Sequence, residues 1–140
     1  MDSLNGFPER DAFAKLAGIE LLEMGPGKAR ACMPVTRDHL NAAGTVHGGA
    51  IFTLADFVFA MASNSHGRLA VAINVSISYL KAVRQGVLTA EAEEISLNQR
   101  IGTYLIRIVD DEKDLVAMFQ GTVYRKKETL EEWRQKYELQ

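Results

Sequence analysis

The feature that most constrains the fold of this chain is one long run of apolar residues. From Ala50 to Ala62 only Thr53 and Asp56 interrupt it. The run is long enough for a helix, which we expect from about residue 47 to residue 63, and the turn residues at 64–67 then end it. A helix that is apolar almost all round has to be covered on nearly every side. The rest of the chain is therefore expected to wrap around it.

Segments with the alternating apolar pattern of β-strands lie on both sides of this helix. The two strands before it are separated by Gly25-Pro26-Gly27-Lys28, which is typical of a hairpin turn. In the strand at 87–97 the apolar residues change parity at Glu93-Glu94, which predicts a β-bulge. The strand at 71–79 has a single apolar face from Val71 to Tyr79. The expected strands cover residues 19–24, 29–35, 71–79, 87–97, 104–108 and 115–124.

Two short helices are expected near the ends of the chain. The first covers residues 10–17 and is capped by Gly18, and the second covers about 127–139. Leu130, Trp133 and Tyr137 have helical spacing and would anchor the second helix on the body of the protein. This order of elements predicts an α+β fold in which a curved antiparallel sheet surrounds the long helix. We expect a single domain over residues 1–140.

Composition excludes several classes of function. The 140 residues are 47% hydrophobic and 24% charged with a net charge of -2, which gives no general attraction to nucleic acid. The longest apolar stretch is too short to cross a bilayer, and the first ten residues lack the pattern of a signal peptide. We therefore expect a cytoplasmic protein with no membrane partner. The three histidines and the single Cys32 lack metal-ligand spacing, so no metal is expected.

Asp56 is the residue of the apolar helix that demands an explanation. Its neighbours one turn away are Phe52, Thr53, Phe59 and Ala60, so no Lys or Arg on the same helix can neutralise it. Burial would raise its pKa, which makes the carboxylate a candidate general base or nucleophile. The alternative is a structural Asp that emerges at a helix edge and bonds a backbone amide.

His47-Gly48-Gly49 supplies a second candidate feature, at the start of the same helix. The first amides of a helix lack intrahelical acceptors, and glycine lets a ligand approach them, so they could form an oxyanion hole. The alternative is a tight entry from the loop into the helix. Gly48 and Asp56 are about 12 Å apart along a helix, whereas one carbonyl has to lie about 3 Å from both groups. If the two residues cooperate, two antiparallel helices of a dimer have to share each site.

The chain resembles the acyl-coenzyme A thioesterases of the hotdog fold, specifically the phenylacetic-acid-degradation (PaaI) type, over about residues 8–126. The resemblance implies a long helix wrapped by an antiparallel sheet, paired into dimers and usually tetramers. The matching positions are His39, Asn41, Gly44, His47-Gly48-Gly49, Leu54-Ala55-Asp56, Asn64-Ser65, Tyr79-Leu80-Lys81, Gly86 and Gly121-Thr122-Val123-Tyr124.

The resemblance also implies roles for individual residues. Asp56 would activate water or attack the thioester, and Gly48 NH of the partner would polarise the carbonyl. Asn41 would hold the carbonyl or the water, and His47 would shape the helix entrance. Candidate contacts with substrate and coenzyme A are Gly49, Thr53, Ser76, Lys81, Arg84, Arg100 and Arg125. Candidates for an apolar acyl pocket are Phe52, Phe57, Phe59, Met61 and Tyr79.

The expected reaction is hydrolysis of a medium-chain or aromatic, phenylacetyl-type acyl-CoA, with no cofactor because coenzyme A is part of the substrate. Some members of the family place a hydroxyl where this chain has Ala72, which leaves open whether Ser76 or Ser78 points inward. Two other functions remain open at this stage. One is a non-catalytic acyl-CoA-binding module, and the other is a hotdog hydratase or dehydratase, which would need a His near Asp56.

Overall fold

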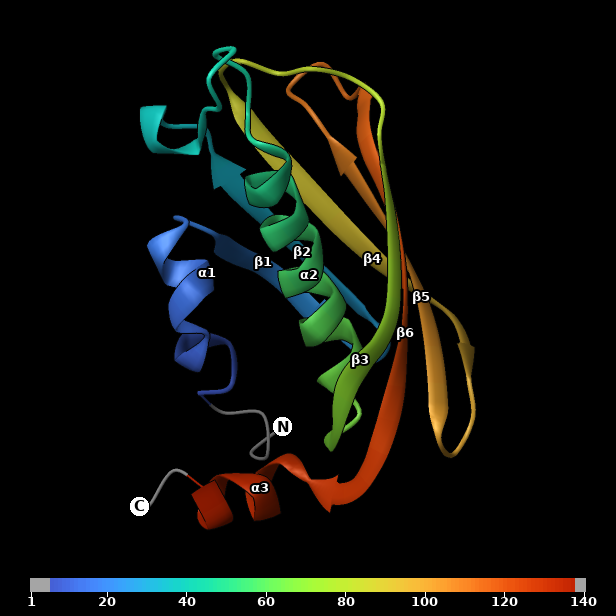
Figure 1. Ribbon diagram of the computed structural model, residues 1–140. Coiled ribbons are helices and arrows are strands. Elements are labelled where there is room, and N and C mark those ends of the chain that lie inside the picture. Colours follow the sequence, from blue (N-terminus) through green and yellow to red (C-terminus); the bar gives the residue numbers. More distant parts are fainter. Residues whose placement is uncertain (1–5, 138–140) are drawn as a thin grey trace.

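The computed structural model describes residues 6–137 and consists of one long helix lying on one face of a six-stranded antiparallel sheet (Figure 1). The long helix is α2 (Gly48–Asn64), and the strand order is β1-β2-β4-β5-β6-β3. This confirms the expected α+β architecture. The strands are β1 (Glu20–Gly25), β2 (Lys28–Pro34), β3 (Arg68–Tyr79), β4 (Val87–Leu97), β5 (Ile101–Val109) and β6 (Leu115–Thr129), and the short helices are α1 (Ala12–Leu16) and α3 (Leu130–Tyr137).

The short N-terminal helix is divided, unlike the continuous helix expected at 10–17. A 3-10 turn covers Pro8–Arg10, and α1 begins only after Asp11, whose carboxylate accepts a hydrogen bond of 3.1 Å from the backbone N–H of Ala14. An Asp in this position is an N-cap and starts a new helix. Gly18 follows α1 with a φ of 79°, as the predicted cap requires.

The C-terminal helix begins later than predicted. Strand β6 continues to Thr129 because it remains paired with β3, where Thr129 lies opposite Arg68. Helix α3 therefore begins at Leu130, and residues 138 and 139 of the expected helix lie outside the described residues. Leu130 is 3% exposed and anchors α3, whereas Tyr137 is 49% exposed and stacks on Trp133 instead, with 4.2 Å between ring centroids.

The core lies between α2 and the inner face of the sheet. Phe59 of α2 packs against Tyr104 of β5 and Phe119 of β6, with ring centroids 5.9 and 5.5 Å apart. Gly121 lies directly under Phe59, and a Cβ at Gly121 would come within 2.6 Å of the ring. Phe57 and Phe59 are thus buried in the core, and neither lines any of the cavities described below.

Two irregularities in the sheet change which residues face α2. The predicted bulge in β4 is confirmed, with a register shift between Glu94 and Ser96. A second shift, between Ala72 and Asn74 of β3, was not predicted. Residues directly opposite each other in an antiparallel pair share a face of the sheet. Before the shift, Val71 lies opposite Tyr124 on the outer face, and after it Val75, Ile77 and Tyr79 lie opposite Gly121, Phe119 and Ala117 on the inner face.

The helix α2 is not covered on every side within this chain. Gly49 and Asp56 are exposed and Thr53 is half-buried, which leaves one stripe of the helix open. The neighbouring strand β3 is an edge of the sheet and exposes Val71, Ile73 and Val75. The expectation of cover on nearly every side is therefore wrong for the chain alone. No helix among residues 6–137 is long and apolar enough to span a membrane.

Candidate active site

The amino end of α2 leaves one glycine amide available. His47 is the N-cap, and its Nδ1 accepts a hydrogen bond of 2.8 Å from the N–H of Gly49. The Gly48 N–H has no acceptor among residues 6–137, whereas its carbonyl accepts a bond of 3.0 Å from the hydroxyl of Tyr79. Of the two glycine amides, the one at Gly48 is thus free to donate, and the positive end of the helix dipole strengthens it.

Asn41 organises the loop that precedes this helix. Its Oδ1 accepts hydrogen bonds from the backbone N–H groups of Ala43 (2.9 Å) and Thr45 (3.1 Å), and its Nδ2 donates to the Thr45 hydroxyl at 3.0 Å. Asn41 and Gly48 also line one cavity of about 410 Å³, together with Tyr79. The fold therefore brings Asn41 and the free amide of Gly48 together at one end of α2.

Asp56 lies on the open stripe of α2, at the middle of the helix. Its carboxylate makes no hydrogen bond and no ion pair within residues 6–137, which contradicts the structural role left open by the sequence. The surrounding protein atoms desolvate the group, and the negative charge of Asp11 adds to this, so the pKa of Asp56 is raised above its usual value. A carboxylate with a raised pKa and no partner is a good candidate for a general base.

The two candidate groups are too far apart to act on one carbonyl within a single chain. Asp56 follows Gly48 by eight positions in the helix, which corresponds to about 12 Å along the axis. None of the cavities that include Gly48 or His47 includes Asp56. Within one chain the two candidate groups therefore cannot act on the same carbonyl.

The structure divides the predicted basic residues into two groups. Lys81 donates to Asp110 at 2.6 Å and to Asp114 at 2.7 Å, and these bonds raise its pKa. Arg84 shares a cavity with Lys81 and with three acidic residues of the β5–β6 turn. Arg100 and Arg125 instead lie at the other end of the sheet, in a cavity of about 560 Å³. That cavity is lined by Arg68, Gln99, Arg100, Tyr124, Arg125 and Lys127.

The remaining predicted contacts are distributed around α2 and β3. The Thr53 hydroxyl donates to the carbonyl of Gly49 at 2.7 Å and lies in a groove with His47. Ser76 and Ser78 pair with Gln120 and Met118 on the outer face of the sheet, so neither is brought near Asp56.

Several residues of the site were not found from the sequence. Tyr79 was considered only for an acyl pocket, but its hydroxyl holds the Gly48 carbonyl. Nothing in the sequence indicated Asp11, because its effect on the pKa of Asp56 depends on how α1 packs against α2. Arg68 and Lys127 line the same cavity as Arg100 and Arg125, because β3 begins where β6 ends. The charged residues at those two strand ends were the signal in the sequence that could have identified this basic cavity.

Comparisons with known proteins show the family of the chain. The family model described as "Thioesterase superfamily" matches residues 43–117. The chain is 48% identical over 118 residues to an Archaeoglobus fulgidus protein named only as a candidate esterase, covering 84% of this chain and 77% of that protein. It is 41% identical over 118 residues to the acyl-coenzyme A thioesterase PaaI of Escherichia coli, covering 84% of each.

The solved structures give the same result. The structure of the E. coli PaaI protein from the phenylacetic acid degradation operon superposes with a TM-score of 0.87 at 37% identity. The match covers 91% of this chain and 94% of that one. The chain therefore belongs to the thioesterase superfamily and is a hotdog-fold member of the PaaI type.

Proposed function

We propose that this chain hydrolyses the thioester of acyl-CoA to a free acid and coenzyme A, using Asp56 of one protomer and the Gly48 amide of another. The observation that carries the proposal is the unpaired carboxylate of Asp56 on the open stripe of α2. A desolvated carboxylate with a raised pKa is a stronger base than an ordinary surface Asp. The 41% identity to an acyl-coenzyme A thioesterase supports the substrate class.

The proposed chemistry needs two groups and no metal-bound nucleophile. The carboxylate of Asp56 either removes a proton from water that attacks the carbonyl carbon, or attacks that carbon itself to give an anhydride that water opens. In both routes the negative charge that develops on the carbonyl oxygen is stabilised by the Gly48 N–H. The C–S bond then breaks. In the first route the proton that Asp56 took from water passes to the leaving sulfur, and in the second coenzyme A leaves as a thiolate, which is protonated by a proton released when water opens the anhydride. Asn41 would orient the carbonyl or the water from the same cavity.

A homodimer would bring Asp56 and the Gly48 amide together. Strand β3 is a 12-residue edge strand with exposed apolar side chains, and proteins normally protect such an edge. Pairing of two β3 edges would place two α2 helices side by side in antiparallel orientation, with each Gly48 near the partner's Asp56. Association of two dimers into a tetramer is expected from the family resemblance.

A charged side chain introduced on the β3 edge should dissociate this proposed dimer. We expect Ile73→Lys, at a side chain 57% exposed in the isolated chain, to give monomers and to reduce thioesterase activity at least about 100-fold, because it buries a charge at the interface. Ile95→Lys is the matched control, since Ile95 is 55% exposed but lies on β4. Light scattering and activity at the same concentration measure both effects. A fully active Ile73→Lys monomer would contradict the shared site.

The phosphates of coenzyme A need a local basic cluster, since the chain carries a net charge of -2. We place them at the cavity of Arg68, Arg100, Arg125 and Lys127. Arginine binds phosphate through two parallel hydrogen bonds, and this cavity has three arginines. Lys81 is a poorer candidate than the sequence suggested, because two carboxylates already hold it.

The pH dependence of activity should change when the negative charge of Asp11 is removed. The reaction needs ionised Asp56, so the rate falls as the pH drops through the raised pKa of that group. Asp11→Asn removes the nearby negative charge and lowers the pKa of Asp56, and Asn also remains a good N-cap for α1. The acid limb of kcat/KM should therefore move to lower pH. An unchanged limb would show that Asp11 does not influence the catalytic group.

Release of free thiol from a panel of acyl-CoA substrates tests the proposed function directly. We expect turnover that depends on the acyl group. Tight binding of an acyl-CoA without turnover would instead favour a non-catalytic binding module, and hydration of an enoyl-CoA would favour a hydratase. A cytoplasmic location, expected from the sequence, would fit an enzyme acting on acyl-CoA.

A further inference from the structure

The hydroxyl of Tyr79, at the end of β3, donates a hydrogen bond to the carbonyl of Gly48, with 3.0 Å between the two oxygen atoms. The two residues are 31 positions apart in the sequence, so the bond joins the end of an edge strand to the first turn of α2. Both residues line the same cavity as Asn41. The bond therefore ends at the residue whose N–H is the proposed donor to the substrate carbonyl.

The register shift in β3 directs the Tyr79 side chain toward α2. Tyr79 lies opposite Ala117 on the inner face of the sheet, after the shift between Ala72 and Asn74. Val71 lies on the outer face ahead of the shift, and a strand without the shift would put Tyr79 on that face as well. The contact between Tyr79 and the start of α2 thus depends on this irregularity of the strand.

Gly48 allows the Tyr79 ring to approach the backbone of α2 directly. A Cβ at position 48 would lie 3.2 Å from Cζ and 3.3 Å from the hydroxyl oxygen of Tyr79. A glycine also lacks the side chain that restricts the backbone dihedral angles of other residues. The orientation of Gly48 therefore has to be fixed by its neighbours.

Two hydrogen bonds hold the peptide group that follows Gly48. Its carbonyl accepts the bond from Tyr79, and its N–H, which belongs to Gly49, donates to Nδ1 of His47 at 2.8 Å. Hydrogen bonds that form a chain through one peptide group polarise and strengthen each other. Together these two bonds restrain the dihedral angles of Gly48, which set the direction of the Gly48 N–H.

We infer that Tyr79 is a positioning residue of the thioesterase reaction and that its hydroxyl aims the Gly48 N–H at the carbonyl oxygen of the substrate. The inference rests on the proposed function. A donor of this kind acts only within hydrogen-bond distance of the oxygen on which negative charge develops, so a small error in its direction lowers the rate. Tyr79 is 51% exposed, and a hydrogen bond between neutral groups is a modest restraint. A moderate effect on the rate is therefore expected.

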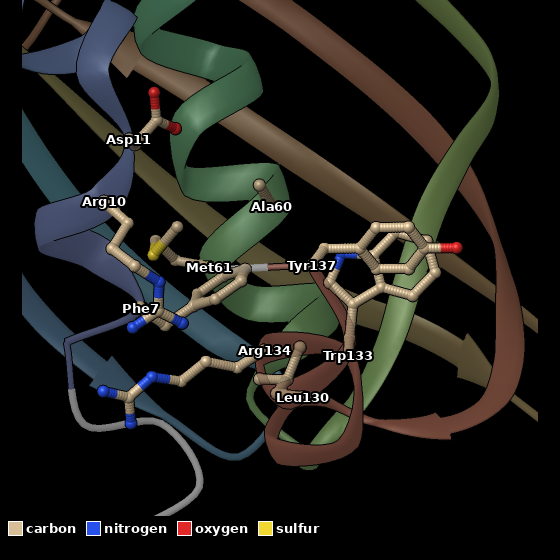
Figure 2. A pocket seen from close by; sticks show the side chains of 9 residues that line it. All are labelled: Phe7, Arg10, Asp11, Ala60, Met61, Leu130, Trp133, Arg134 and Tyr137. Carbon is tan, nitrogen blue, oxygen red and sulfur yellow. The ribbon is translucent and has the colours of Figure 1, made fainter. Parts of the chain in front are cut away.

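Tyr79→Phe removes the hydroxyl and keeps the ring. We expect kcat for acyl-CoA hydrolysis to fall about fivefold to tenfold with KM nearly unchanged, because the lost restraint acts on the transition state. Tyr137→Phe is the matched control, since Tyr137 is 49% exposed but lies on α3, beside the carboxyl-terminal end of α2 (Figure 2). The control should keep the wild-type kcat. A Tyr79→Phe protein that also keeps it overturns the inference.

The residue at position 48 shows whether Tyr79 acts through the amide. Gly48→Ala retains the N–H, so adding Tyr79→Phe should reduce kcat by the same factor as in the wild type. Gly48→Pro lacks the N–H, so adding Tyr79→Phe should change the residual kcat less than about twofold. Both substitutions place a Cβ against the same ring, which separates the role of the N–H from the steric effect. The inference is overturned if the two backgrounds respond alike.

Hydrogen exchange of the Gly49 N–H tests the positioning without turnover. Loss of the Tyr79 hydroxyl weakens the bond from this N–H to His47, so exchange should become about threefold faster or more in Tyr79→Phe and stay unchanged in Tyr137→Phe. An unchanged rate in Tyr79→Phe overturns the inference. Wild-type protein that releases no thiol from any acyl-CoA overturns the proposed function instead, and the exchange rate still decides whether Tyr79 holds the start of α2.

Discussion

Asp56→Asn is expected to reduce kcat for thioester hydrolysis at least about 1000-fold, since it removes the proposed base or nucleophile while keeping the size of the side chain. Acyl-CoA binding should persist, because the proposed contacts with coenzyme A lie in the basic cavity of Arg68, Arg100, Arg125 and Lys127. The measurement is thiol release at saturating substrate, with affinity determined separately by titration. A variant that keeps more than a tenth of wild-type kcat would exclude Asp56 from the chemistry.

The same substitution should also increase stability at neutral pH. The pKa of Asp56 is higher in the folded protein than in the unfolded chain, so stability falls as the pH rises from the unfolded pKa to the raised one, and the full cost of the ionised carboxylate is present above the raised pKa. Asp56→Asn removes this cost. Its melting temperature should therefore exceed that of the wild type at pH 7, and the difference should shrink as the pH falls through the raised pKa. A loss of both activity and stability would indicate misfolding instead.

Gly48→Pro should reduce kcat about 100- to 1000-fold, the usual effect of losing one oxyanion-hole donor. Proline is well accepted at the first position of a helix and removes only the backbone N–H there. His47, which precedes it, has φ and ψ of -58° and 136°, the extended conformation that a residue before proline prefers. The substitution therefore deletes the proposed hydrogen-bond donor with little disturbance of the backbone.

Gly48→Ala is the matched control for this prediction. A Cβ at position 48 would lie 3.2 Å from Cζ of Tyr79, so that exposed ring has to move slightly in both variants. Only the proline variant also lacks the N–H. We expect Gly48→Ala to retain most of the activity. If alanine and proline reduce kcat equally, the effect is steric and the amide has no role.

Local patterns in the sequence predicted most of the architecture. The apolar run of α2 and the alternating Tyr104, Ile106 and Ile108 of β5 each depend on neighbouring residues, so their periodicity identified them. The proposed catalytic pair could also be found from the sequence, since a carboxylate without a counter-charge on its own helix and two glycines at a helix start are visible there. Their separation along one helix was enough to predict a site shared between protomers.

The parts that the sequence did not reveal depend on tertiary packing. The β3 shift between Ala72 and Asn74 places Val71 on the outer face, although simple alternation puts it with Tyr79. The basic cavity of Arg68, Arg100, Arg125 and Lys127 forms because distant strand ends are adjacent in the sheet, and the cavity at Ala60 and Met61 forms because residues 7–11 and α3 both reach that end of α2. No local pattern in the sequence predicts either cavity.

Complementation between the two inactive variants tests the central claim most directly. When Asp56→Asn and Gly48→Pro chains are co-expressed, each mixed dimer contains one site with both Asp56 and the Gly48 amide and one site with neither. With random pairing half of the dimers are mixed, so activity should recover to about a quarter of the wild-type value. If the mixture shows only the residual activity of the two parents although mixed dimers form, each site is built within one chain and the shared site is wrong.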